Sequence, residues 1–323
     1  MKKYNVGILG CASIAKRFMI PAMKKAASIR DIYIASRNRE VALNIASQFG
    51  INEERTYQSL IDNHDIDIIY IPLPTGLHKE WIAKALNMNK HVISEKSLTE
   101  SFTDTLSVVN LAREKGLLVI ENFMFTHHSQ HAHIKDLIDA GEIGEIRSFR
   151  SSFGFPPFKD DENIRYNKEL GGGALLDAGG YTVKAAQLIL GLDLEVLGSH
   201  LYMDSIRGID LWGSTFLKSK SKDVSAQLSF GFDHFYQCNY EVWGTIGKII
   251  VHRSFTAGPD IMPQITIEKQ NLRVDKILSS DNHFIKILDN FTELIANKHF
   301  YASKYDELLN QSRLLTEIKN HAQ

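Results

Sequence analysis

The chain has 323 residues, of which 44% are hydrophobic and 23% charged; this composition excludes a disordered chain, and the length suits about two domains. Its 37 basic and 38 acidic side chains leave a net charge of −1, so no charge excess exists to bind nucleic acid or an anionic membrane. We find no apolar run near the roughly 18 residues that span a bilayer, no signal-peptide pattern and only two cysteines. We therefore expect a soluble cytoplasmic protein.

The first part of the chain alternates short apolar strands with helices. Such alternation is typical of βαβ units, whose right-handed crossovers place the carboxyl ends of all strands at one edge of a parallel sheet. We therefore predict an α/β domain over residues 1–123. Its predicted strands cover 4–9, 31–35, 66–71, 91–94 and 117–122, and its predicted helices cover about 14–27, 39–49, 78–88 and 101–115.

The pattern changes after residue 123, where strand-like segments follow one another with short turns. Consecutive strands of this kind indicate a mostly antiparallel sheet. We predict an α+β domain over residues 124–323, with its last helix a candidate to pack back on the first domain. Its predicted strands cover 146–153, 194–205, 210–218, 224–232, 235–243, 248–255 and 264–269, and its predicted helices cover about 131–140, 174–190, 283–297 and 304–321.

The turn after the first predicted strand contains small residues in the order Gly10-x-Ala12-x-x-Ala15. A dinucleotide fingerprint has the form G-x-G-x-x-G/A, in which the first glycine permits a tight turn and the second brings the backbone close to a pyrophosphate. Here Ala12 replaces the second glycine. The place of the turn at the first βα junction favours a Rossmann domain that binds a dinucleotide, and the alternative is a turn that binds nothing.

The end of the second predicted strand distinguishes NAD from NADP. An acidic residue there bonds the ribose 2′-hydroxyl of NAD, whereas an arginine accommodates the 2′-phosphate of NADP. This chain has Ser36-Arg37-Asn38-Arg39 and no acid before Glu40. We therefore expect NADP(H) in preference to NAD(H); the alternative is a solvated basic loop.

Two further segments follow predicted strands and so fall at the edge of the sheet where ligands bind. His78 ends the segment Pro72–His78, and Lys96 is the central residue of Glu95-Lys96-Ser97. A lone histidine is more often structural, and an exposed lysine is more often only solvated. Position alone therefore makes both residues candidates for the site and no more.

The segment Gly171–Tyr181 combines a run of glycines with a carboxylate and a phenol. Asp177 and Tyr181 are four residues apart and share one face of the predicted helix. They are candidates for substrate binding and proton transfer. The alternatives are a carboxylate favoured by the helix dipole for Asp177 and a core aromatic for Tyr181.

Four histidines occur within residues 127–133, but no acid or cysteine accompanies them at a spacing suited to zinc. We therefore expect no metal site. His128 and Gln130 are instead candidates to project from the domain junction toward a substrate.

Taken in order, these segments resemble the glucose-fructose oxidoreductase / inositol dehydrogenase / MocA family over the whole chain. The resemblance implies an α/β Rossmann domain followed by an α+β domain with a large, mostly antiparallel open sheet. It also implies that Lys96 is catalytic and that Asp177 and Tyr181 belong to the active site. The motifs that carry it are Gly7–Ala15, Ala35–Arg37, Pro74–His78, Glu95–Ser97, Glu121–Met124 and Gly171–Tyr181.

Three positions depart from the family pattern: Ser97 replaces a proline, Thr75 an asparagine and Thr126 an arginine. The predicted site residues, by the motifs and the resemblance together, fall into two sets. Those assigned to the cofactor are Gly10, Cys11, Ala12, Ser13, Ile14, Ser36, Arg37, Leu73, Pro74, Thr75, His78, Glu95 and Lys96. Those assigned to the substrate are His128, Gln130, Arg165, Tyr166, Asp177 and Tyr181.

Within the family, Asn163-Ile164-Arg165-Tyr166 ahead of the glycine run most resembles NADPH-dependent 3-ketoreductases of nucleotide-linked deoxysugars. We expect reduction of such a 3-keto sugar, with Tyr181 as proton donor and Lys96 as the cation beside it, or with these roles reversed. The alternative enzyme is an NADP-dependent dehydrogenase of a free aldose such as xylose, or of a trans-dihydrodiol. The alternative of another class is a non-catalytic NADP-binding sensor.

One face of the predicted second sheet packs on helices, so the other face is free to bind a partner. We expect segments such as Leu228–Phe232 and Tyr240–Trp243 to supply apolar side chains to that free face. The resemblance also implies a homodimer or homotetramer built on this sheet.

Overall fold

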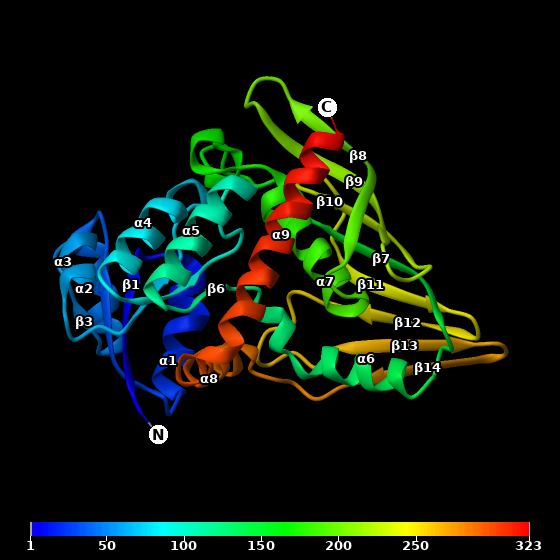
Figure 1. Ribbon diagram of the computed structural model, residues 1–323, viewed down its shortest axis with the longest axis horizontal. Coiled ribbons are helices and arrows are strands. Elements are labelled where there is room, and N and C mark those ends of the chain that lie inside the picture. The colour runs from blue at the N-terminus through cyan, green and yellow to red at the C-terminus, as the bar shows by residue number, and fades with distance from the viewer. Residues whose placement is uncertain (1, 323) are drawn as a thin grey trace. The chain divides into compact units, whose positions relative to one another are not determined.

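The structure is a computed structural model that describes residues 2–322 and divides them into two compact units (Figure 1). Unit 1 contains residues 2–122 and 284–309, and unit 2 contains residues 123–283 and 310–322. The last helix, α9 (Tyr301–His321), therefore begins in unit 1 and ends in unit 2.

The sheet of unit 1 consists of β1 (Tyr4–Leu9), β2 (Ile29–Ala35), β3 (Asn52–Glu53), β4 (Ile68–Ile71), β5 (His91–Ser94) and β6 (Val119–Glu121). Its strand order is β3-β2-β1-β4-β5-β6, and neighbouring strands are parallel. The order reverses between β1 and β4, as in doubly wound dinucleotide-binding folds, which confirms the predicted Rossmann domain. Both central strands are fully buried.

The helices of unit 1 are α1 (Ile20–Lys25), α2 (Arg39–Phe49), α3 (Tyr57–Asp62), α4 (Thr75–Asn87), α5 (Phe102–Lys115) and α8 (His283–Ala296). Asn38, Thr56 and Ser101 begin three of them, because each side chain accepts a hydrogen bond from a main-chain N–H of the first turn. The single helix predicted at 14–27 is instead a π-helical segment, Ala15–Met19, followed by α1. Neither β3 nor α3 is predicted by the apolar pattern of the sequence.

The sheet of unit 2 consists of β7 (Ile146–Gly154), β8 (Leu194–Asp204), β9 (Ile209–Ser219), β10 (Ser225–Gly231), β11 (Gln237–Gly244), β12 (Gly247–His252), β13 (Gln264–Lys269) and β14 (Leu272–Ile277). Its order is β14-β13-β12-β11-β7-β10-β9-β8. Neighbouring strands are antiparallel except β7 and β10, which are parallel. The predicted, mostly antiparallel open sheet is confirmed, with β14 as an unpredicted edge strand.

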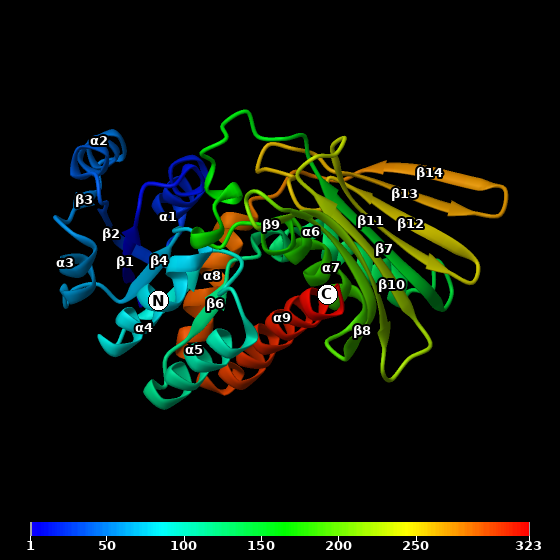
Figure 2. The ribbon, with the colours of Figure 1, turned by 90° about the horizontal axis from the view of Figure 1, so that it is seen from above.

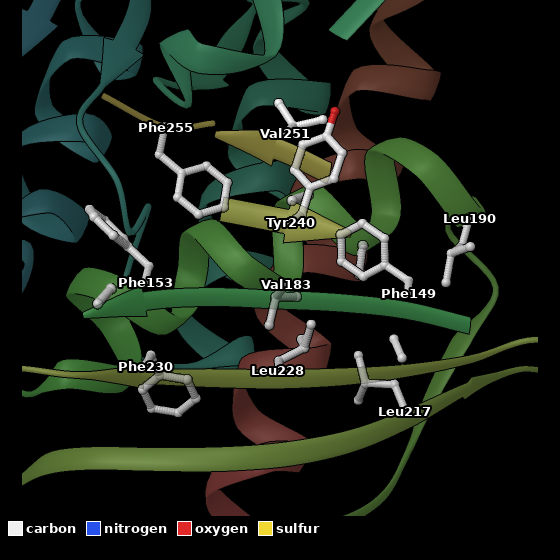
Figure 3. Packing of buried hydrophobic residues seen from close by; sticks show 14 of the residues in the cluster. Phe149, Phe153, Val183, Leu190, Leu217, Leu228, Phe230, Tyr240, Val251 and Phe255 are labelled. Atoms are coloured by element: carbon white, nitrogen blue, oxygen red, sulfur yellow. The ribbon is translucent and has the colours of Figure 1, made fainter. Parts of the chain in front are cut away.

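Helices α6 (Ser129–Asp139), α7 (Gly180–Leu190) and the C-terminal part of α9 pack on one face of this sheet (Figure 2). The core between the helices and the sheet is rich in aromatic side chains, among them Phe149, Phe153, Phe230 and Tyr240 (Figure 3). Successive residues of a strand point to opposite faces, so the alternating apolar residues of β7, β10 and β11 all enter this core.

The expectation that residues 228–232 and 240–243 supply apolar side chains to a free face is wrong for most of these residues. Leu228, Phe230 and Tyr240 are buried in the core, because the apolar residues of their strands face the helices. Trp243 is 49% exposed and Phe216 is 40% exposed, so these two aromatic side chains do lie at the surface.

A buried histidine makes the stability of unit 2 sensitive to acid. His131 lies in α6 with Nδ1 2.9 Å from Tyr240 Oη and Nε2 3.1 Å from the Ser254 carbonyl oxygen. Nε2 must donate to that carbonyl, so Nδ1 accepts from the tyrosine and the ring is neutral. Burial lowers the pKa of His131 to about 3.

The pKa of His131 in the folded protein lies below the ordinary value of about 6.5. The contribution of the neutral ring to the free energy of unfolding is therefore present at pH 7 and is lost as the pH falls from about 6.5 toward 3. We expect roughly 3 kcal/mol less free energy of unfolding at pH 4 than at pH 7 from His131. Urea titrations at both pH values measure it. In His131→Gln the free energy of unfolding should fall less between pH 7 and pH 4. His64→Gln, a change at an exposed residue, is the control and should leave this fall unchanged. The same fall in all three proteins would contradict the role given to His131.

Candidate active site

The turn after β1 is shaped to admit a bulky ligand. Gly10 has φ +106° and donates its N–H to the Ala35 carbonyl at 2.8 Å. A Cβ at Gly10 would lie 3.0 Å from Leu73 Cδ2 and 3.4 Å from Tyr57 Oη, so glycine keeps this space open. Ala12 and Ser13 follow with small side chains at the carboxyl end of the strand. These features fit the diphosphate of a dinucleotide.

The two arginines after β2 have different surroundings. Arg39 donates from Nε to Glu53 Oε1 at 2.9 Å, and Asn38 between the arginines begins α2. Ser36 Oγ accepts from the N–H of Asn38 at 3.2 Å, which holds the turn that carries Arg37. The exposed Arg37 is therefore the guanidinium that fits a 2′-phosphate.

His78 is fully buried and connects two loops at the carboxyl edge of the sheet. Its Nε2 lies 2.7 Å from the Leu73 carbonyl oxygen and its Nδ1 lies 2.8 Å from the Ser97 carbonyl oxygen. Burial is the largest influence on the His78 pKa and lowers it. His78 was predicted to contact the cofactor, and its two ring nitrogens face the carbonyl groups of Leu73 and of Ser97, the residue after Lys96.

The turn after β5 carries Lys96 directly after the buried Glu95. Glu95 is only 8% exposed, and its Oε1 accepts from Tyr70 Oη at 2.7 Å and from Asn122 Nδ2 at 2.5 Å. Burial raises the pKa of Glu95, while these hydrogen bonds and the nearby Lys96 ammonium oppose that rise. The peptide bond between Lys96 and Ser97 is cis. Lys96 itself is partly exposed.

In unit 2, a glycine turn brings Arg165 back toward α7. Gly172 donates to the Asn167 carbonyl at 2.9 Å, and Gly173 donates to the Arg165 carbonyl at 3.0 Å. A Cβ at Gly172 would lie 2.5 Å from the Arg165 carbonyl oxygen, so a larger residue would push the two segments apart. A π-helical segment, Leu175–Gly179, then leads into α7.

Arg165 and Asp177 form an ion pair that the spacing of the two residues in the sequence does not predict. Arg165 Nε lies 2.6 Å from Asp177 Oδ2, and the guanidinium carbon lies 5.0 Å from the ring centroid of Phe158. The Asp177 carboxylate is the main cause of the raised Arg165 pKa, and Tyr181 acts in the same direction. The Arg165 guanidinium is therefore held beside Asp177.

The ring of Tyr181 is fixed by other aromatic side chains of unit 2. Its centroid lies 5.1 Å from Phe153, 5.3 Å from Phe123, 5.5 Å from Phe255 and 5.7 Å from Phe125. The residue is still partly exposed. Tyr181 therefore packs against core aromatic side chains, as its alternative interpretation states, and also lies at the surface of unit 2.

The remaining substrate candidates are held by contacts both near and distant in the sequence. His128 and Gln130 are buried, and His128 Nδ1 accepts from the N–H of Gln130 at 3.1 Å at the start of α6. Gln130 Nε2 donates to the Ser254 carbonyl at 3.4 Å. Tyr166 Oη accepts from the N–H of Phe158 at 3.0 Å.

Over residues 2–322, no three histidine, cysteine or acidic side chains gather in a way that would hold a metal ion. None of the helices in the described part of the chain is long and apolar enough to cross a membrane.

Comparison with known families agrees with this geometry. Residues 4–123 match the GFO_IDH_MocA oxidoreductase family with an NAD-binding Rossmann fold, and residues 131–250 match the GFO/IDH/MocA C-terminal domain. The chain belongs to the GFO/IDH/MocA oxidoreductase family. It is therefore an oxidoreductase with a Rossmann domain and the C-terminal domain of that family.

Several GFO/IDH/MocA relatives carry names that specify a reaction. The chain is 43% identical to a dTDP-3,4-didehydro-2,6-dideoxy-alpha-D-glucose 3-reductase from Saccharopolyspora spinosa, over 90% of this chain and 87% of that protein. A 3-ketoreductase from Actinomadura kijaniata, solved with NADP and TDP-benzene, superposes with a TM-score of 0.94 at 38% identity and covers 99% of this chain and 98% of its own. A D-xylose 1-dehydrogenase (NADP(+)) from Haloferax volcanii is 28% identical over 98% of this chain and 97% of that protein.

The structure places further residues of this GFO/IDH/MocA chain at the candidate site that were not predicted from sequence. Tyr70 and Asn122 hold Glu95 from the ends of β4 and β6, and Tyr57 lies beside Gly10. A motif search over consecutive residues cannot group them, because they come from separate strands and helices. Asn122 ends the predicted strand 117–122 and lies within the motif Glu121–Met124, and this was the available signal for it.

Proposed function

We propose that this chain is an NADP(H)-dependent 3-ketoreductase of a nucleotide-linked deoxysugar. The observation that carries the proposal is the 43% identity to a dTDP-sugar 3-reductase over 90% of the chain. The close superposition on a 3-ketoreductase solved with NADP and TDP-benzene supports the same cofactor and the same kind of substrate.

The proposed cofactor site lies in unit 1. Residues 10–14 would hold the diphosphate, Ser36 and Arg37 the 2′-phosphate, and residues 73–75 with Glu95 and Lys96 the remainder of the molecule. Bound NADPH supplies the hydride that reduces the carbonyl carbon. The side chains of the protein then have to orient the sugar and deliver a proton to the carbonyl oxygen.

We assign proton donation to Tyr181. A tyrosine has an ordinary pKa near 10, so a neighbouring cation is needed to make its proton easier to transfer near pH 7. We assign this role within unit 2 to Arg165, because its guanidinium pairs with Asp177, four residues before Tyr181. Lys96 would hydrogen-bond the same carbonyl oxygen and stabilise its negative charge. The reversed assignment makes Lys96 the donor.

We assign the substrate contacts to Arg165, Tyr166, Asp177 and Tyr181. Two guanidinium nitrogens of Arg165 lie beyond the Nε that binds Asp177, and a guanidinium suits the phosphates of a nucleotide-linked sugar. His128 and Gln130 stay predicted substrate contacts; both side chains are buried at the start of α6.

The experiment that tests the function is NADPH consumption with a nucleotide-linked 3-keto-6-deoxyhexose generated in place, beside NADP⁺ reduction with a panel of free aldoses. Turnover of the nucleotide-linked sugar alone supports the proposal. Turnover of free aldoses alone would replace it with the sugar dehydrogenase. Cofactor binding without turnover of either would favour the non-catalytic sensor.

Arg37→Ala tests the proposed cofactor preference. We expect the Kd of NADPH to rise about thirtyfold and that of NADH to change less than about twofold, because a charge-assisted pair with the 2′-phosphate contributes roughly 2 kcal/mol. Fluorescence titration of the cofactor measures both. Arg39→Ala is the matched control, since Glu53 already binds that arginine. Equal losses for the two cofactors would exclude Arg37 from the 2′-phosphate site.

We also propose a homodimer or homotetramer formed through the outer face of the unit 2 sheet. Tyr202 and Trp212 stack there with centroids 5.3 Å apart and planes 5° from parallel, and Phe216 on β9 is 40% exposed. An exposed aromatic surface of this kind favours association. Light scattering of the full chain and of Phe216→Lys tests it, and a monomer at micromolar concentration would contradict it.

A cytoplasmic location is proposed as well. Both cysteines, Cys11 and Cys238, are free thiols, as is usual in reducing compartments. Cell fractionation tests this, and recovery of the protein outside the cytoplasm would contradict it.

A further inference from the structure

Asp210 of β9 connects the sheet of unit 2 to the segment that carries Asp177. Its Oδ2 accepts a hydrogen bond from the main-chain N–H of Leu175 at 2.5 Å, although the two residues are 35 positions apart in the chain. Leu175 is the first residue of the π-helical segment, and Ala174 before it has no side chain that caps the first turn. Asp210 therefore caps this turn from a separate strand.

The other carboxylate oxygen of Asp210 lies against Gly173. A Cβ at Gly173 would be 2.4 Å from Asp210 Oδ1, and the φ of Gly173 is +119°, so glycine is what lets the chain pass this close to the carboxylate. Gly173 donates its N–H to the Arg165 carbonyl oxygen at 3.0 Å, and its own carbonyl oxygen accepts from the N–H of Asp177 at 3.3 Å. Gly173 is thus bonded to the backbone of both members of the Arg165–Asp177 ion pair.

The charge of Asp210 suits this place as well as its shape. The main-chain N–H groups and the dipole at the start of a helix favour a negative charge. Partial burial raises the pKa of Asp210, and the hydrogen bond from the Leu175 N–H opposes that rise. A hydrogen bond to an ionised oxygen is stronger than one to a neutral acceptor, so the carboxylate holds the start of the segment firmly.

The far end of the same segment is held by α9. The buried Gln311 donates from Nε2 to the Gly180 carbonyl oxygen at 2.9 Å, and Gly180 directly precedes Tyr181. Polar side chains from β9 and α9 therefore hold the two ends of the segment, and Asp177 lies between them.

We propose that Asp210 is a positioning residue for the substrate site: it places the start of the segment that carries Asp177 and Tyr181, and with it the Arg165–Asp177 ion pair. The inference rests on the proposed function, in which these side chains bind the sugar and deliver the proton. A displacement of about 1 Å in a group that orients the reaction can lower its rate about a hundredfold. A contact that fixes the start of the segment therefore acts on kcat.

Asp210→Ala tests the proposal because it removes the acceptor of the Leu175 N–H. We expect kcat per folded molecule for the nucleotide-linked 3-keto-6-deoxyhexose to fall about thirtyfold and the Kd of NADPH to change less than about twofold. Asp210→Asn keeps an oxygen that accepts from Leu175 and loses the charge, so its kcat should be only about threefold lower. Steady-state NADPH oxidation measures kcat, and fluorescence titration measures the Kd.

NMR of the arginine Nε–H groups gives a readout that requires no turnover. The Nε–H of Arg165 is bonded to Asp177 Oδ2 at 2.6 Å, and its signal is assigned by its absence in Arg165→Lys. We expect this signal to shift or broaden in Asp210→Ala and to shift less in Asp210→Asn. A role of Asp210 in stability alone would lower the melting temperature without moving the signal.

Asp193→Ala is the matched control, because Asp193 Oδ2 also accepts from a main-chain N–H of unit 2, that of Ser221 at 3.0 Å. It should leave kcat and the Arg165 signal unchanged. The proposal is overturned if Asp193→Ala lowers kcat as much as Asp210→Ala does, or if Asp210→Ala changes neither kcat nor the signal. Should circular dichroism show that Asp210→Ala does not fold, unchanged kcat together with an unmoved signal in Asp210→Asn would overturn it.

The two readouts separate this inference from the function on which it rests. If the unchanged protein turns over no nucleotide-linked ketosugar, the proposed function is wrong, and the Arg165 signal alone decides whether Asp210 places the ion pair. If the unchanged protein is active and Asp210→Ala matches it in kcat and in the Arg165 signal, only the role of Asp210 is wrong.

Discussion

Replacing Lys96 by alanine should lower kcat for the nucleotide-linked ketosugar about a thousandfold, which corresponds to roughly 4 kcal/mol of transition-state stabilisation. The expected cause is loss of the cation that faces the negative charge on the carbonyl oxygen. The turn that carries Lys96 is held by the buried Glu95, so the variant should keep its fold. Steady-state NADPH oxidation measures the effect.

Lys79→Ala is the matched control for this experiment. Lys79 lies on α4 of the same unit, and its Nζ is 2.5 Å from Asp104 Oδ1 at the surface. A pair this exposed contributes little, so kcat should stay within about twofold of the unchanged protein. If Lys96→Ala also kept kcat within about twofold, Lys96 would have no part in the chemical step.

Replacing Tyr181 by phenylalanine should lower kcat about a hundredfold while the affinity for NADPH changes less than about twofold. The variant loses the proton donor and keeps the aromatic contacts with Phe123 and Phe153, so its melting temperature should barely change. Tyr236→Phe, which removes a tyrosine hydroxyl bonded to Thr256 in the same unit, is the control.

The pH dependence of kcat distinguishes the two possible donors. A general acid must be protonated, so kcat falls as the pH rises through its pKa. If Tyr181 donates the proton, this alkaline decrease disappears in Tyr181→Phe. If it persists there and disappears in Lys96→Ala, the reversed assignment holds and Lys96 is the donor.

The strands and helices of the Rossmann domain were largely predictable because their signals are local. Five of the six strands of its sheet and the helices α2, α4 and α5 follow from apolar runs and helical spacing. The exceptions are short: β3 has two residues and α3 has six. A segment of that length has no period to recognise, which is why Tyr57 at the start of α3 was absent from the predicted site.

Two helices were predicted in the right places, but their first turns are π-helical. Residues 15–19 and 175–179 form π-helical turns, and each leads directly into an α-helix. Apolar spacing in sequence does not separate a π turn from an α turn, because the two differ by less than one residue per turn. Their distinction depends on which carbonyl each N–H reaches in the folded chain.

Composition, periodicity and the order of the motifs were sufficient to predict the two-domain α/β plus α+β architecture and the family, because each rests on residues close together in the sequence. The folded chain was needed to identify the partners of the charged side chains. Arg39 pairs with Glu53 rather than with a phosphate, and Arg165 pairs with Asp177 across a glycine turn. It was also needed to locate the apolar face of β10 and β11 against the helices. Such choices depend on residues brought together by chain reversals and sheet pairing, and neither composition nor local spacing contains that information.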